Sequence, residues 1–191
     1  MTSTLEIDPR TTALVIIDLQ KGIVAMPTEP HDTTSVIANA VRLTRAFRQR
    51  EMPVFLVHVL RSRDTALRPI ADGPVPSLDA LPADWSEIVP ELGPEPSDVV
   101  IPKRQWGAFY GTELEMRLRR GGIDTVVLAG IATTYGVQST ARVAYEHGYQ
   151  QIFVEDAMSD RSRESHRASV EFVLKRIGRV RTTEEVLGAL A

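Results

Sequence analysis

One stretch, residues 124–140 (DTVVLAGIATTYGVQST), constrains the fold most. Its apolar run from Thr125 to Ala129 has the length and composition of a buried strand, and helical spacing begins at Gly136. The turn between strand and helix, which starts at Gly130, leaves backbone N–H groups without partners at the start of the helix. Such groups favour a carboxylate, a phosphate or a developing oxyanion. The stretch therefore predicts a strand, a tight corner and a helix that together bind an anion.

Nucleophilic enzymes often carry a Ser or a Cys at such a corner, and here the position is Gly136. The sequence contains no cysteine. A thiol nucleophile, a thiolate zinc site and a disulfide are therefore excluded for this chain. Its chemistry must proceed without a covalent thioester, or the chain must be inactive.

Four further apolar runs have the pattern of buried strands: residues 13–17, 53–60, 98–101 and 151–154. Helical spacing follows in the stretches 36–47, 114–118, 137–145 and 170–177. Two capping boxes, Thr112 with Glu115 and Thr182 with Glu185, predict the start of a helix each. Unbroken apolar strands that alternate with helices predict an α/β fold of three layers, α/β/α, with a mostly parallel sheet and helices on both faces.

The length of 191 residues suits one well-buried domain and is short for two, so we expect a single domain over residues 1–191. A net charge of -3 disfavours nucleic acid or an anionic membrane as a partner. The N-terminal residues lack the pattern of a signal peptide, and no run approaches about 18 apolar residues. A soluble, cytoplasmic protein is the simplest expectation.

Residues 62–97 show no periodicity and contain seven of the twelve prolines. A loop of this length in a compact domain is usually functional or packed on a partner subunit. A surface excursion without a function is the alternative. We expect a homo-oligomer, a dimer or a tetramer, in which the stretch around Trp85 covers a neighbouring subunit.

Ligands of an open α/β sheet bind outside the carboxyl ends of its strands. Asp18 follows the first strand, Lys103 the third, the corner at Gly130 the fourth, and Glu155 with Asp156 the fifth. An acid, an ammonium group and backbone donors should therefore converge at one edge. A nearby Lys would keep Asp18 ionised, whereas burial would raise its pKa and let it act as an acid near neutral pH. The sequence leaves both outcomes open, as it does a turn role for Asp18 and a solvated Lys103.

Three blocks resemble, in the same order, the isochorismatase-like hydrolases, a superfamily that includes cysteine hydrolases such as nicotinamidases. They are ALVIIDLQKGIV, VIPKRQWGAFYGTELEMRLRRGGIDTVVLAG and GIATTYGVQSTARVAYEHGYQQIFVEDAMSD. The resemblance implies a parallel sheet of about six strands. It also implies that Asp18 and Lys103 match the catalytic Asp and Lys of the cysteine-dependent members, whose nucleophile position falls on Gly136.

The resemblance further implies a cis peptide bond before Ala132, which would direct the N–H groups of residues 132 and 136 at the substrate. Additional candidate substrate contacts lie beside matched positions, and packing is the alternative role for the aromatic ones. They are Gln20, Trp106, Phe109 and Tyr135.

Nicotinamidases of the superfamily carry a metal-binding Asp-x-His with further histidines. The histidines of this chain stand far apart, without a His-x-His or His-x-x-x-His pair. They are His31, His58, His147 and His166. We therefore expect no catalytic metal and no cofactor, and we expect His58 to be a core or rim residue.

The true isochorismatases of the superfamily resemble this chain in having glycine at the nucleophile position. Their reaction, hydrolysis of a vinyl ether, needs no nucleophilic side chain. On this hypothesis Asp18 is the general acid for a small-molecule substrate, Lys103 sets its protonation, and the corner N–H groups bind water or a substrate carboxylate. A dicarboxylate substrate would call for basic residues, for which the sequence offers Lys103, Arg104 and Lys21.

Two alternatives stay open. The chain is an amide (C–N) hydrolase made inactive by glycine in place of cysteine at position 136, or it is a binding or scaffold protein that kept the fold without catalysis. Cysteine installed at position 136 distinguishes the first alternative, and Asp18→Asn tests the second.

Overall fold

The computed structural model describes residues 5–61, 69–73 and 81–190. One six-stranded sheet runs in the order β3-β2-β1-β4-β5-β6, and every neighbouring pair is parallel. The strands are β1 (Thr12–Ile17), β2 (Val54–Val59), β3 (Val99–Lys103), β4 (Thr125–Ile131), β5 (Gln150–Ser159) and β6 (Arg179–Arg181). The predicted parallel α/β fold with helices on the sheet is confirmed.

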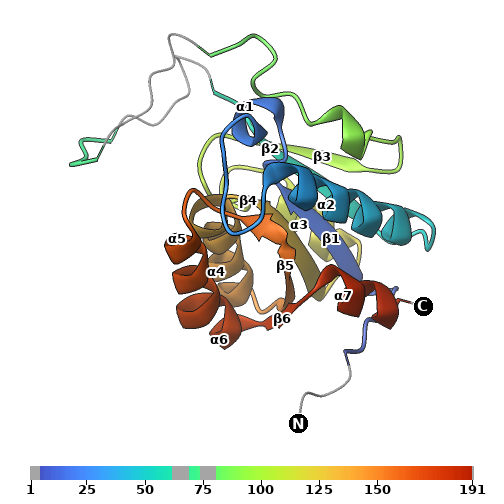
Figure 1. The fold of residues 1–191 in the computed structure, drawn as a ribbon. Coiled ribbons are helices and arrows are strands. Elements are labelled where there is room, and N and C mark those ends of the chain that lie inside the picture. The colour runs from blue at the N-terminus through green and yellow to red at the C-terminus, as the bar shows by residue number, and fades with distance from the viewer. Residues whose placement is uncertain (1–4, 62–68, 74–80, 191) are drawn as a thin grey trace.

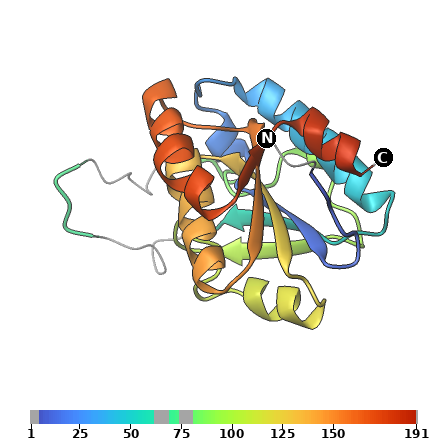
Figure 2. The same ribbon diagram turned by 90° about the horizontal axis from the view of Figure 1, so that it is seen from below.

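Helices cover both faces of this sheet (Figures 1 and 2). On one face lie α2 (Thr33–Arg48) and α7 (Thr183–Ala189), and on the other lie α3 (Leu114–Arg120), α4 (Gln138–Glu146), α5 (Arg163–Ser169) and α6 (Lys175–Ile177). Shorter elements are α1 (Lys21–Val24), the 3-10 turn η1 (Pro90–Leu92) and the π-helical turns η2 (Thr133–Val137) and η3 (Val170–Leu174).

Two apolar clusters form the core, one on each side of the sheet. The central strand β1 divides its residues between them, with Val15 and Ile17 on the α4 side and Leu14 and Ile16 on the α2 side. Every residue of β1 is buried. Burial on both faces explains why this strand is an unbroken apolar run. The next residue, Asp18, therefore lies at the carboxyl end of a central, buried strand.

Strand β5 extends beyond its predicted end at residue 154 and finishes at Ser159. After an irregularity in the pairing with β4, Met158 and Ser159 lie opposite Gly130 and Ile131. The acidic pair Glu155 and Asp156 thus lies inside the strand, in its irregular stretch, where residues distant in sequence form hydrogen bonds with both carboxylates. The prediction that this pair follows the fifth strand was therefore wrong.

Two smaller predictions also differ from the structure. Helix α3 has Glu113 at its N-cap without a side-chain bond, and Glu115 pairs with Arg119, so the capping box of Thr112 and Glu115 does not form. Strand β6 escaped prediction because it is a half-buried RVR triplet without an apolar run. The second capping box, Thr182 with Glu185, is confirmed at the start of α7.

The proline-rich region is described in part, and residues 62–68 and 74–80 lie outside the described residues. Its second half packs on its own chain. The ring of Trp85 is buried against Gly22, and Ile88 forms an antiparallel bridge with Gln20. Trp85 thus already has its cover within one chain, and the expected oligomer stays a prediction.

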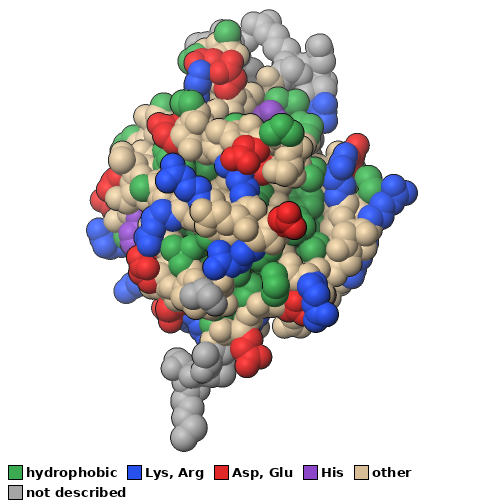
Figure 3. Space-filling model, turned by 90° about the vertical axis from the view of Figure 1, so that its right-hand side faces the viewer, with side chains coloured by type: hydrophobic (Ala, Val, Ile, Leu, Met, Phe, Trp, Pro, Cys, Tyr) green, Lys and Arg blue, Asp and Glu red, His purple; other side chains and the backbone are tan. Residues whose placement is uncertain are grey.

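Acidic and basic side chains are interspersed over the face that includes β3 and α2 (Figure 3). Among the described residues, no helix combines the length and the apolar character needed to cross a bilayer.

Candidate active site

Asp18 and Lys103 form a buried ion pair at the carboxyl edge of the sheet. The ammonium nitrogen of Lys103 donates to Asp18 Oδ2 at 2.7 Å, and both side chains are almost fully buried. Lys103 also donates to the carbonyl oxygens of Gln105 at 3.1 Å and Trp106 at 2.7 Å. All three ammonium protons therefore have acceptors, which fixes the position of the group.

Burial governs the protonation of Asp18. It raises the pKa of the Asp18 carboxyl to about 6, although the charge of Lys103 and its hydrogen bond act in the opposite direction. The second oxygen, Oδ1, is buried and receives no hydrogen bond from any residue that the structure describes. Asp18 is thus a carboxyl that can hold a proton near neutral pH, with one oxygen fixed by Lys103 and the other unpartnered.

Gly136 lies directly against this pair. A Cβ atom at position 136 would stand 2.8 Å from Ile17 Cγ2, 2.9 Å from Asp18 Oδ2 and 3.7 Å from Lys103 Nζ. Gly130 approaches the same strand end, because it has a φ of 121° and its Cβ would overlap the carbonyl oxygen of Ile17. Glycine at both positions lets the corner pack onto the end of β1.

The corner is held by hydrogen bonds on both sides. The peptide bond between Ile131 and Ala132 is cis. The π-helical turn η2 begins at Thr133, earlier than the predicted Gly136. One backbone donor of this turn is already engaged. The N–H of Thr134 donates to Asp160 Oδ2 at 2.6 Å, and the Thr134 hydroxyl donates to the same oxygen. The N–H of Thr134 is therefore not available to an anion.

Hydrogen bonds of Thr140 join the corner to the segment after Lys103. The hydroxyl of Thr140 donates to the carbonyl oxygen of Gly136 at 2.7 Å and accepts from the N–H of Ala108 at 3.1 Å. The corner and the Lys103 segment therefore form one fixed unit around Asp18.

The candidate substrate contacts separate into two groups. Trp106 and Tyr135 are 60% and 43% exposed and meet edge to face with ring centroids 4.9 Å apart. They border the pair, because the carbonyl of Trp106 binds Lys103 and Tyr135 precedes Gly136. The half-buried Ala132 lies at the start of the same corner.

Gln20 and Phe109 have other roles in the structure. The Gln20 amide donates to the carbonyls of Val59 and Trp85 and accepts from the N–H of Val59 at 2.7 Å, so it joins two segments of backbone. Phe109 is buried in the core, with its ring centroid 6.0 Å from that of Tyr149. Hydrogen bonds to the backbone therefore account for Gln20, and core packing accounts for Phe109.

Of the basic residues that the sequence offered, Lys103 forms the site, whereas Lys21 has other partners. Lys21 is engaged with Asp84 at 3.0 Å and Glu87 at 2.7 Å. Arg61 instead lies over the ring of Trp85, 5.1 Å from the centroid. Its pKa is lowered by burial and by the charge of Arg161, and raised by the charge of Asp18. Arg61 is thus close enough to both Asp18 and Arg161 for their charges to act on it.

Sequence reasoning missed both arginines although each follows a strand. Arg61 comes two residues after the end of β2, and Arg161 two residues after the end of β5. The rule on strand ends would have found Arg61. Arg161 was hidden by the wrong end assigned to β5.

Two of the four histidines are far apart in sequence but close together in the structure. His31 and His166 both direct Nε2 at Glu155 Oε1, at 3.0 Å and 2.9 Å. His58 instead has Nδ1 2.7 Å from the carbonyl oxygen of Ser86, and His147 pairs with Glu115. Since His31 and His166 lie on segments far apart in the chain, their spacing carries no signal of this contact.

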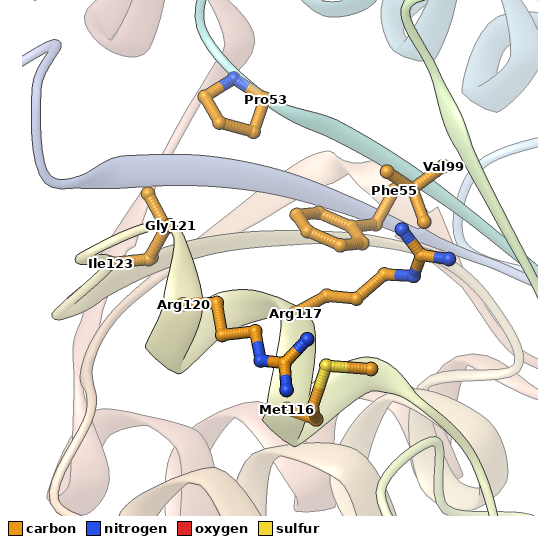
Figure 4. A pocket seen from close by; sticks show the side chains of 8 residues that line it. All are labelled: Pro53, Phe55, Val99, Met116, Arg117, Arg120, Gly121 and Ile123. Carbon is orange, nitrogen blue, oxygen red and sulfur yellow. The ribbon is translucent and has the colours of Figure 1, made fainter.

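A hollow of another kind lies at the opposite edge of the sheet (Figure 4). Arg117 and Arg120 of α3 reach over it, and its strand residues lie at the amino ends of β2 and β3. It is lined by Pro53, Phe55, Val99, Met116, Arg117, Arg120, Gly121 and Ile123. The hollow is therefore separate from Asp18 and Lys103, which lie at carboxyl ends.

Comparisons with known proteins agree with this fold. The family model of the isochorismatase domain matches residues 12–185. The uncharacterized isochorismatase family protein YwoC of Bacillus subtilis (strain 168) is 50% identical over 189 residues, which cover 98% of each chain. A Pseudomonas chlororaphis protein named "probable isochorismatase" is 31% identical over 183 residues, 95% of this chain and 87% of that protein. The solved structure of an isochorismatase family protein from Burkholderia thailandensis has a TM-score of 0.92 and 44% identity, over 98% of this chain and 99% of that one.

Proposed function

The chain belongs to the isochorismatase family, and from that premise we propose that it hydrolyses the vinyl ether of a small, isochorismate-like acid. The observation that carries this proposal is the state of Asp18. Its carboxyl is buried, has a pKa raised to about 6, and keeps Oδ1 without a partner among the described residues. A positioned carboxylic acid of this kind is suited to general acid catalysis near neutral pH.

The reaction begins with proton transfer from Asp18 Oδ1 to the terminal methylene carbon of the vinyl ether. The electrons of the double bond form the new C–H bond, and the ether carbon becomes an oxocarbenium ion. Water adds to that carbon and loses a proton, which restores Asp18. The resulting hemiketal forms the keto group of pyruvate and breaks the bond from its carbon to the ether oxygen. The proton of the hemiketal hydroxyl passes to that oxygen, which leaves as the hydroxyl of the ring alcohol. One water is consumed and no redox partner is needed.

Lys103 assists this step by its contact with Oδ2. When Asp18 gives up its proton, the resulting carboxylate already has the ammonium group 2.7 Å away. The negative charge is therefore stabilised as it forms, without reorganisation of the site. Because Lys103 occupies Oδ2, the transferable proton belongs on Oδ1.

Gly136 contributes close packing and a backbone donor in this proposal. The absence of a side chain lets the backbone at position 136 lie against the Asp18 carboxyl, where a Cβ would stand 2.9 Å from Oδ2. We assign the N–H groups of Ala132 and Gly136 to the attacking water or a substrate carboxylate. No covalent intermediate with the protein is formed.

Substrate recognition in this proposal depends on charge and on the exposed aromatic pair. Arg61 supplies positive charge near Asp18, and Arg161 lies near Arg61, which suits an acidic substrate. Trp106 and Tyr135 offer apolar faces to the ring of the substrate. The 31% identity to a protein named "probable isochorismatase" supports the same substrate class.

The packing at position 136 counts against an amide hydrolase that lacks only its cysteine. A cysteine Cβ there would stand 2.8 Å from the methyl carbon Ile17 Cγ2, so the Ile17 side chain or the corner would have to shift. The test is Gly136→Cys with a panel of small amides. Rapid amide hydrolysis by this variant, with none by the natural sequence, would favour the amidase alternative.

The experiment for the proposed function follows pyruvate release from isochorismate by the purified protein. We expect pyruvate in the wild-type reaction and a large loss with Asp18→Asn. If the folded wild-type protein releases no pyruvate, the proposed reaction is wrong. If turnover persists unchanged in Asp18→Asn, the role of Asp18 is wrong.

A further inference from the structure

We propose that His31, Glu155 and His166 form a binding site for one divalent transition-metal ion of the Zn²⁺ type, separate from Asp18 and Lys103. The three side chains come from the segment before α2, from strand β5 and from helix α5. Their ligand atoms all lie within 4.8 Å of one another. This site goes beyond the proposed hydrolysis and does not depend on it.

The ligand set and its geometry fit such an ion. Two imidazole nitrogens and one carboxylate oxygen are ligands that zinc accepts. Glu155 Oε1 stands 3.0 Å from Nε2 of His31 and 2.9 Å from Nε2 of His166. Neighbouring ligand atoms of a tetrahedral zinc site are roughly 3.3 Å apart, given metal–ligand bonds of about 2.0–2.2 Å. Small shifts of the Glu155 side chain therefore open the position for the ion.

A hydrogen bond behind His166 favours the tautomer that a metal needs. The Thr133 hydroxyl donates to the carbonyl oxygen of Ser159 at 3.1 Å and lies 2.9 Å from Nδ1 of His166. The Thr133 hydroxyl has a single hydrogen, which it donates to the carbonyl oxygen of Ser159. In its contact with His166 the hydroxyl oxygen must therefore accept, and Nδ1 of His166 donates. A metal ion between Nε2 of His166 and Glu155 would then take the place of the Nε2 proton. Metal-ligating histidines commonly have such an outer hydrogen bond.

The backbone around His31 is fixed before any ion binds. The carbonyl oxygen of His31 accepts from the hydroxyls of Ser159 at 2.6 Å and Thr28 at 2.8 Å. The side chains of His31 and Glu155 are 29% and 31% exposed, whereas His166 is 4% exposed. One side of the site is therefore open, so that an ion can enter and water can complete its coordination.

The site lies directly behind the corner of the candidate active site. Thr133, which contacts His166, is the first residue of η2, the turn that carries Gly136. A bound ion would join three chain segments and hold this turn in place. Its role is positional, since none of its ligands belongs to the Asp18 pair.

The test is calorimetric titration of the metal-stripped protein with Zn²⁺. The wild type should bind one ion per chain, and His31→Gln and His166→Gln should each weaken binding at least roughly tenfold. A matched control is His147→Gln, because His147 also pairs with a glutamate, at 3.2 Å from Glu115, but has no third ligand. This control should bind Zn²⁺ like the wild type.

Thermal unfolding gives a second readout that needs no activity. Saturating Zn²⁺ should raise the Tm of the wild type and of His147→Gln and leave the Tm of the two ligand variants unchanged. Melting without metal checks that the variants fold, and His31→Gln, at the more exposed position, keeps the test valid if His166→Gln does not. The proposal is wrong if the wild type takes up no ion, or if the two ligand variants keep wild-type affinity.

Discussion

Lys103 fixes one oxygen of the Asp18 carboxyl at 2.7 Å and leaves the other buried without a donor among the described residues. This asymmetry gives the two oxygens different tasks. Oδ2 stays in the ion pair, and Oδ1 carries the proton that the proposed reaction needs. The predictions below test the pair and the groups around it.

The first prediction concerns pH. The pKa of Asp18 is raised from 3.8 to about 6, so the protonated form is lost as pH rises through that value. If Asp18 is the general acid, kcat/KM for isochorismate should be constant below about pH 6 and fall above it. A pH–rate profile measures this, and a kcat/KM that instead rises between pH 5 and 7 would exclude Asp18 as the acid.

Stability provides a check of the same pKa without a substrate. Unfolded Asp18 releases its proton near pH 3.8 and folded Asp18 near pH 6, so the folded state binds more protons between these values. The free energy of unfolding of the wild type, relative to Asp18→Asn, should therefore fall as pH rises from 4 to 6. Urea unfolding at several pH values shows the trend, and a flat difference would mean that the pKa is not raised.

Lys103→Met should destabilise the protein strongly. It leaves the carbonyls of Gln105 and Trp106 and the buried Asp18 without their common donor. Breaking a buried pair in this way costs about 3–5 kcal/mol. The control is Lys175→Met, which removes an exposed helix pair with Glu171 and should cost no more than about 0.5 kcal/mol. Equal losses in denaturant unfolding for the two variants would contradict the importance of burial.

Gly136→Ala should lower kcat because the added methyl group displaces Asp18, and not merely because the protein becomes less stable. The added Cβ lies 2.8 Å from Ile17 Cγ2 and 2.9 Å from Asp18 Oδ2, so it displaces the acid from its place beside Lys103. We expect a loss in kcat of at least roughly tenfold, because misplacement by about 1 Å can cost 10²-fold. Gly188→Ala in α7 is the control, since its Cβ meets nothing within 4 Å, and it should keep wild-type kcat. A fully active Gly136→Ala would show that the site tolerates a side chain there.

Arg61→Gln should weaken binding of an acidic substrate. Arg61 lies near Asp18 and over Trp85, whereas Arg176 on α6 is exposed and distant in the fold. A lost hydrogen bond to a charged group costs about 1.5–3 kcal/mol, which is roughly a 10–100-fold rise in KM. Steady-state kinetics should show this rise for Arg61→Gln and not for Arg176→Gln. A KM unchanged in both would remove Arg61 from substrate recognition.

Much of the fold could be predicted from sequence because burial leaves a local pattern. Strand β1 is buried on both faces and is therefore an unbroken apolar run. The carboxyl half of β5 lacks such a pattern, because Glu155 and Asp156 find their partners on distant segments. The three-residue β6 is too short and too polar to show any period.

The site also has parts that the sequence could predict and parts that it could not. Asp18 and Lys103 each follow an apolar strand, so their meeting at one edge could be expected from topology. The strength of burial at Asp18 could not, since it depends on side chains from several elements. Gln20 was a candidate by position alone, and only the structure shows that its amide is committed to backbone groups. The contact of His31 with Glu155 spans 124 positions and has no sequence signal.

The most direct test of the proposed function is the rate of pyruvate release from isochorismate by the wild type and by Asp18→Asn, with circular dichroism to show that both are folded. Asn keeps the shape of the side chain and removes the proton, and general acid catalysis contributes roughly 10²–10⁴-fold. We predict stoichiometric pyruvate from the wild type and a rate lower by about that factor in the variant. No pyruvate from the folded wild type, or equal rates for the two proteins, would contradict the proposal.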